Sequence, residues 1–186
     1  LLTACDRMAK NAMKVGDGDR VAEILSARGY SVLGQNLVKE ENKLFELYRK
    51  RLEEAWPGTG LELVRSLPPE RGYDLAIKAK PIEDLTPLKG IPLRSLIIYE
   101  TKVADISALR DMPLRILRIV RSPVADLAPL KGMPLTTLTV AETKVTDLSM
   151  LKGMRLTSLA LNGIAGFDLN LLKGMPLASL EIVRMQ

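Results

Sequence analysis

Leucines recur at a fixed interval through the second part of the chain. Short stretches such as LRSLIIYE and LTTLTVAE contain them, and apolar and polar residues alternate there with the period of a β-strand. An earlier stretch, YDLAIKA, lies one interval before the first of these. The pattern predicts six strands, near residues 73–79, 94–100, 115–121, 136–142, 157–162 and 178–184. Two leucine columns with a spacing of 21 residues run through them: Leu93, Leu114, Leu135, Leu156 and Leu177, and Leu96, Leu117, Leu138, Leu159 and Leu180.

The segments between the strands also repeat, in the form DLxPLKG. We expect each Asp to accept free backbone N–H groups at the start of a short helical turn. Each Lys ends the turn near the negative end of its dipole, and the following Gly adopts a left-handed conformation. Asp111 replaces that Gly in one copy, and Asp tolerates the same conformation. The Asp column is Asp84, Asp105, Asp126, Asp147 and Asp168; the cationic column is Lys89, Arg110, Lys131, Lys152 and Lys173.

The interval and the L-x-x-L-x-L spacing resemble the leucine-rich-repeat family, in particular short bacterial forms such as the internalins and 21-residue arrays that carry the PLKGM phrase. The resemblance covers residues 73–186. It implies an α/β repeat fold, a solenoid of six parallel strands with a buried leucine ladder. It also implies a concave sheet that binds a protein or peptide partner.

Residues 1–72 have a different pattern and predict a helical N-terminal cap region. Helices are expected over residues 1–15, from Asp19 to Ala27, and over 41–56. The last of these carries an apolar stripe formed by Leu44, Leu47, Tyr48, Leu52, Ala55 and Trp56. We expect this stripe to cover the exposed end of the first strand. The alternative is that the helices fold over the open face of the sheet.

Composition argues against catalysis. The chain has no His and one Cys, with a net charge of +5, which excludes His-dependent catalytic sites and the usual zinc clusters. We predict no enzyme activity and no cofactor. We also predict no metal site, because the Asp column already has a capping role. The excess positive charge is spread along the chain, so nucleic acid is not a favoured partner. The cationic column suits an anionic surface, but helix-end capping also explains it.

The chain begins LLTACD, which resembles a bacterial lipobox with Cys5 as the lipidated residue. The alternative is an amphipathic helix, because Leu1, Cys5, Met8 and Ala12 follow helical spacing. Membrane association is expected only if Cys5 is lipidated. Both interpretations stay open, so the cell envelope and the cytoplasm are equally favoured locations.

The strand positions that point away from the leucine ladder predict a binding patch. Large side chains gather in two neighbouring strands, and apolar residues beside Tyr and Arg are typical of binding hot spots. The patch residues are Ile97, Tyr99, Ile116, Arg118 and Val120. The favoured function is a non-catalytic protein- or peptide-binding scaffold. The alternatives are a structural subunit of a cell-envelope complex and a regulatory fragment of a larger bacterial signalling protein.

The last strand predicts a second contact surface. The stretch LEIVR has no following repeat in this chain, so its outer edge has backbone groups and aliphatic side chains available for pairing. We expect either that the natural protein continues the array here, or that this edge is an interface for another copy or a partner strand, formed by Leu180, Ile182 and Val183.

Overall fold

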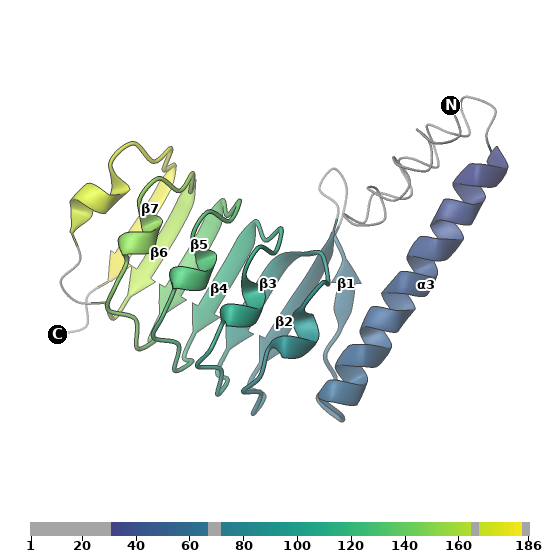
Figure 1. The fold of residues 1–186 in the computed structure, drawn as a ribbon. Coiled ribbons are helices and arrows are strands. Elements are labelled where there is room, and N and C mark those ends of the chain that lie inside the picture. The colour runs from purple at the N-terminus through teal and green to yellow at the C-terminus, as the bar shows by residue number, and fades with distance from the viewer. Residues whose placement is uncertain (1–30, 67–71, 165–167, 184–186) are drawn as a thin grey trace.

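The computed structural model describes residues 31–66, 72–164 and 168–183. A long helix, α3 (Ser31–Ala55), precedes a seven-stranded sheet whose strands follow one another in chain order (Figure 1). The strands are β1 (Leu63–Arg65), β2 (Tyr73–Lys78), β3 (Leu93–Tyr99), β4 (Ile116–Val120), β5 (Thr137–Ala141), β6 (Ser158–Asn162) and β7 (Ser179–Val183).

Strands β2 to β7 are parallel, and each pairs with the equivalent strand of the next repeat. Leu96 is opposite Leu117, and Leu117 is opposite Leu138, so the register follows the 21-residue interval. The bounds of these strands differ from the expected ones by at most one residue at each end. We call β2 to β7 and the turns that join them the repeat array.

In the described residues the sheet has seven strands, one more than the six that were expected. The additional strand, β1, runs antiparallel to β2 and pairs Leu63 with Leu75. Its three residues are too few to give a recognisable alternation, and it lies in the part of the chain for which only helices were expected. The structure therefore extends the sheet into the region before residue 73.

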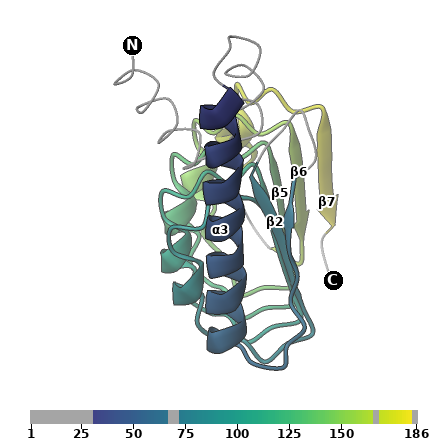
Figure 2. The same ribbon diagram turned by 90° about the vertical axis from the view of Figure 1, so that its right-hand side faces the viewer.

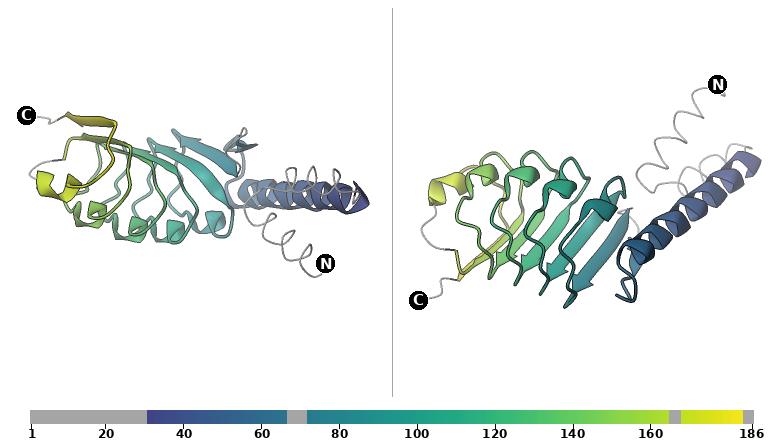
Figure 3. Two further views of the ribbon diagram at one scale, coloured as in Figure 1. Left: turned by 90° about the horizontal axis from the view of Figure 1, so that it is seen from above. Right: turned by 60° about the horizontal axis from the view of Figure 1, so that its bottom comes forward.

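The core lies between the sheet and a second layer of short 3₁₀ turns. These turns are η1 (Thr86–Leu88), η2 (Ser107–Leu109), η3 (Ala128–Leu130), η4 (Ser149–Leu151) and η5 (Leu169–Leu172). Figure 3 shows the strands along one side of the molecule and the turns along the other. Leu96, Leu117 and Leu138 are fully buried between the two layers. The predicted leucine ladder is therefore present through these repeats.

The Asp residues cap the turns as predicted. In every described copy the carboxylate accepts the backbone N–H two residues further on, at 2.7–2.8 Å. This hydrogen bond, from the backbone of Ser107 to Asp105, is the first cause of the lowered pKa of Asp105. Asp111 has a φ of +62°, beside +78° at the equivalent Gly90, which confirms the predicted substitution of Asp for Gly.

The cap helix covers the first end of the repeat array. The rings of Phe45 and Tyr48 lie 5.5 and 5.8 Å from the ring of Tyr73, and Leu52 and Trp56 are buried in the core. Figure 2 looks along the array and shows α3 standing across its end, between the strands and the turns. In the described part of the chain, α3 therefore does not fold over the open face of the sheet.

Two details of the predicted helix were wrong. The described helix already includes Ser31, whereas a start at residue 41 was expected, and its buried stripe is rotated. Leu47 is 56% exposed, whereas Phe45 packs on the core. Residues 44–47 read LFEL, so periodicity alone does not decide which side of the helix faces the core. The contact between the rings of Phe45 and Tyr73 decides it.

Several predictions fall outside the described residues, namely the helices over 1–15 and 19–27 and the lipidation of Cys5. Within the part that is described, the structure has no helix with the length and apolarity that a membrane span requires.

Candidate functional site

The open face of the sheet is formed by the side chains of β2 to β7 that point away from the turns. They form three columns across the strands, because equivalent residues are paired in register. The columns are Asp74, Ser95, Ile116, Thr137, Ser158 and Ser179; Ala76, Ile97, Arg118, Thr139, Ala160 and Glu181; and Lys78, Tyr99, Val120, Ala141, Asn162 and Val183.

The five residues of the predicted patch lie together on β3 and β4. Ile97 is directly opposite Arg118, and Tyr99 is directly opposite Val120, with Ile116 one column away. The four uncharged side chains are half-buried, and Arg118 is exposed. On β5 and β6 the same columns hold Thr, Ser, Ala and Asn. The large side chains are therefore followed by smaller ones on the two strands after β4.

A charged cluster that the sequence analysis missed lies beside this patch. The Arg121 guanidinium donates to Glu100 Oε1 at 2.8 Å and to Glu142 Oε2 at 3.0 Å. It also donates to the Tyr99 hydroxyl at 2.9 Å, and its central carbon lies 5.8 Å from the Tyr99 ring centroid. The alternating Glu, Arg and Glu are 21 residues apart, so the repeat itself was the available signal.

Backbone conformation aims this cluster outward. Glu100, Arg121 and Glu142 each follow a strand directly and have φ values of +51°, +50° and +49°. Non-glycine residues rarely adopt a positive φ. The equivalent Ala79 and Gly163 also have one, at +51° and +72°, so the conformation belongs to the repeat. Each keeps its N–H in the sheet ladder; for example, Arg121 donates to the carbonyl of Ala141 at 3.0 Å. The three side chains therefore leave the end of the sheet in the same direction and meet.

The cluster changes the electrostatics of its members. The hydrogen bond from Arg121, followed by that from Tyr99, lowers the pKa of Glu100 below its ordinary value. The hydrogen bonds to Glu100 and then Glu142 raise the pKa of Arg121. Within the described residues, Arg118 makes no ion pair or side-chain hydrogen bond. Arg121 therefore holds Tyr99 in place, whereas the exposed guanidinium of Arg118 is available to a ligand.

The predicted edge residues lie on β7, which pairs only with β6 in the described part of the sheet. Leu180 and Val183 are 46% and 43% exposed, whereas Leu159, the equivalent of Leu180 one repeat earlier, is 1% exposed. The Ser179 N–H donates to Thr157, and the Val183 carbonyl accepts from Gly163. Alternation along a strand therefore directs the backbone groups of Leu180 and Ile182 to the outer edge.

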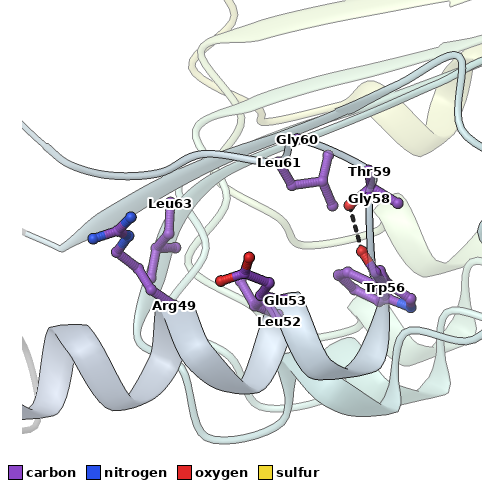
Figure 4. A pocket seen from close by; sticks show the side chains of 9 residues that line it. All are labelled: Arg49, Leu52, Glu53, Trp56, Gly58, Thr59, Gly60, Leu61 and Leu63. Carbon is purple, nitrogen blue, oxygen red and sulfur yellow. Dashed lines mark hydrogen bonds between the residues drawn. The ribbon is translucent and has the colours of Figure 1, made fainter.

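A cavity of about 360 Å³ lies between the end of α3 and β1 (Figure 4). Leu52, Trp56 and Leu63 give it an apolar wall, and Arg49 and Glu53 line it as well. The Thr59 hydroxyl donates to the Trp56 carbonyl at 2.7 Å and closes the turn after the helix. This cavity lies at the covered end of the array and is separate from the open face. In the described ranges, no three His, Cys, Asp or Glu residues are grouped so as to hold a metal ion.

Comparison with known proteins supports the fold. No protein-family model matches the chain, and no curated protein sequence matches it. The crystal structure of an internalin, InlF of Listeria monocytogenes, is similar, with 28% sequence identity and a TM-score of 0.54. The match covers 60% of this chain and 34% of the internalin chain, so it spans about a third of that protein. The likeness supports an α/β repeat fold of leucine-rich-repeat type.

We expect Arg121→Ala to raise the pKa of Glu100 toward its ordinary value, because the substitution removes the hydrogen bond that contributes most to lowering it. An NMR titration of the side-chain carboxyl carbons measures this directly. Arg118→Ala is the matched control, since Arg118 lies on the same strand as the residues leading to Arg121 and makes no bond to Glu100. An unchanged Glu100 pKa in Arg121→Ala would show that the cluster does not form.

Proposed function

We propose that this protein is a non-catalytic scaffold of the 21-residue leucine-rich-repeat type, a solenoid that binds a protein or extended peptide on the open face. The observation that carries the proposal is the register of Ile97, Tyr99, Ile116, Arg118 and Val120 on two adjacent strands. Apolar side chains around an aromatic residue and an arginine supply the usual anchors of a protein interface.

The patch is held rigidly from behind and from the side. Leu96, Ile98 and Leu117 alternate with the patch residues along the same strands and are fully buried. The Arg121 contacts fix the hydroxyl and ring of Tyr99. A surface whose side chains are already ordered loses little conformational entropy on binding, so more of the contact energy appears as affinity.

The exposed guanidinium of Arg118 indicates the chemistry of the partner. It lies beside Ile97 and between the Ile116 and Val120 columns. A partner segment that places a carboxylate next to aliphatic or aromatic side chains matches this arrangement, because Arg binds a carboxylate through two parallel hydrogen bonds. The likeness to an internalin supports the scaffold role at the level of the fold.

We expect Tyr99→Ala and Arg118→Ala each to weaken binding of the partner about tenfold or more, equivalent to ~1.4 kcal/mol. The partner is first recovered with the native protein from lysate and membranes of the source cells, and the affinities are then measured with purified components by calorimetry. Arg110→Ala is the control, since Arg110 is exposed and follows η2 on the turn layer instead of the open face. If both patch variants bind as tightly as the native protein, the open-face patch is not the site.

A second candidate function is assembly through the outer edge of β7. The exposure of Leu180, compared with its buried equivalents, favours it. Outward N–H and carbonyl groups at Leu180 and Ile182 are able to pair with a strand of a second copy. In this function the protein is a structural or assembly subunit that joins a second copy through the edge of β7, and the open face of the sheet remains available to another partner.

Light scattering at increasing concentration tests this assembly. We expect a dimer that Leu180→Pro abolishes, because proline removes an outward N–H, and that Leu180→Ala weakens less. Val64→Ala, at a half-exposed position of the strand at the opposite end of the sheet, is the control for Leu180→Ala. A protein that stays monomeric at all concentrations would exclude the edge as an interface.

A further inference from the structure

A basic groove lies at the edge of the sheet where β5 and β6 begin. It has a volume of about 430 Å³ and is formed by the loops that follow η3 and η4. Four cationic side chains line it, Arg115, Lys131, Lys152 and Arg155, and the residues that line it include no Asp or Glu. The groove lies outside the open-face patch and contains none of its five residues.

The four cations are not used by the fold itself. All four are exposed, and within the described residues none forms an ion pair or donates a side-chain hydrogen bond. Lys131 and Lys152 end their turns as predicted, but only their backbone N–H groups bond to turn carbonyls. The two lysine side chains therefore make no capping hydrogen bond, and their charged groups are open to a ligand.

A neighbouring groove provides a comparison within the same molecule. It is formed by the equivalent loops after η1 and η2 and has a volume of about 670 Å³. Its cations are Lys89 and Arg110, and Asp111 lines it as well. The repeat alone thus gives two cations per groove. The groove between the later loops is smaller and has two additional guanidinium groups without an acid.

Arg155 is the residue that distinguishes the groove. The equivalent position in the other four repeats is proline, at Pro92, Pro113, Pro134 and Pro176. Arginine adds a cation and also a backbone N–H, which proline lacks. In the described part of the chain this N–H has no hydrogen-bond partner. The one departure from the repeat therefore supplies two groups that bind oxyanions.

We propose that this groove binds a dianionic phosphate group, either as the free ion or as a phosphomonoester. Guanidinium groups bind phosphate oxygens through paired hydrogen bonds, and lysines add point charges. Four cations gathered around one concave site also concentrate positive potential there, which favours a dianion over a singly charged group. Free phosphate and the phosphoserine of a partner protein share this chemistry. The proposal does not depend on the open face.

Calorimetry at low ionic strength with inorganic phosphate tests the site. We expect saturable binding with one site per chain, and about tenfold weaker binding in Arg155→Pro, which restores the residue of the other repeats. Lys131→Gln/Lys152→Gln also weakens it. Lys89→Gln/Arg110→Gln removes the same charge from the neighbouring groove and leaves the affinity within about twofold. Circular dichroism confirms folding, and Arg155→Gln replaces Arg155→Pro if that variant unfolds.

A phosphoserine peptide and its unphosphorylated form distinguish the two sources. Tighter binding of the phosphopeptide than of inorganic phosphate indicates a phosphorylated partner, and equal or weaker binding indicates a small ligand. In either case the affinity must fall in Arg155→Pro. Tyr99→Ala leaves either affinity unchanged. The proposal is overturned if millimolar phosphate gives no saturable binding. It is equally overturned if Lys89→Gln/Arg110→Gln loses as much phosphate affinity as the groove variants. A third contrary result is that single-stranded RNA binds more tightly than phosphate and loses affinity equally in the variants of the two grooves.

Discussion

Burial of each repeat against the next is the interaction on which the structure depends. A single strand and its turn cannot enclose their own leucines, so Leu117 is sealed by Leu96 on one side and Leu138 on the other. Because these side chains must remain in contact, the strands keep one register and the turns repeat at one interval. At the first end of the repeat array, in the described part of the chain, no earlier repeat covers the core. Phe45 and Tyr48 of α3 pack on Tyr73 there instead.

A fixed interior leaves the outward positions free to differ between repeats. In most other repeats, smaller or uncharged residues occupy the positions of Tyr99, Arg118 and Arg155. None of these three side chains is part of the buried leucine ladder. The same frame thus presents a mixed apolar and cationic patch on the sheet, and at its edge a groove whose charged residues are all cationic. Both proposed sites arise from departures from the repeat, and the buried columns give each a rigid support.

The sequence was informative where one residue type has one physical role in every copy. The leucine columns, the Asp caps and the left-handed Asp111 follow from spacing and conformational preference. Strand β1 was missed because three residues carry no measurable period, and the inward face of α3 depends on a contact with Tyr73, far along the chain. The Arg121 cluster needs a positive φ at Glu and Arg, which the preferences of these residues do not predict. The five patch residues were placed together correctly, and their binding role stays a prediction.

Equilibrium unfolding in urea of Leu138→Ala and Leu180→Ala tests the central claim most directly. Both substitutions change the same position of the repeat, but Leu138 is fully buried between two repeats and Leu180 is 46% exposed on the last described strand. We expect Leu138→Ala to lower the free energy of unfolding by about 2–5 kcal/mol. Leu180→Ala is expected to lower it by about 1 kcal/mol or less. Equal losses in the two variants would contradict the claim that contact between successive repeats holds the fold together.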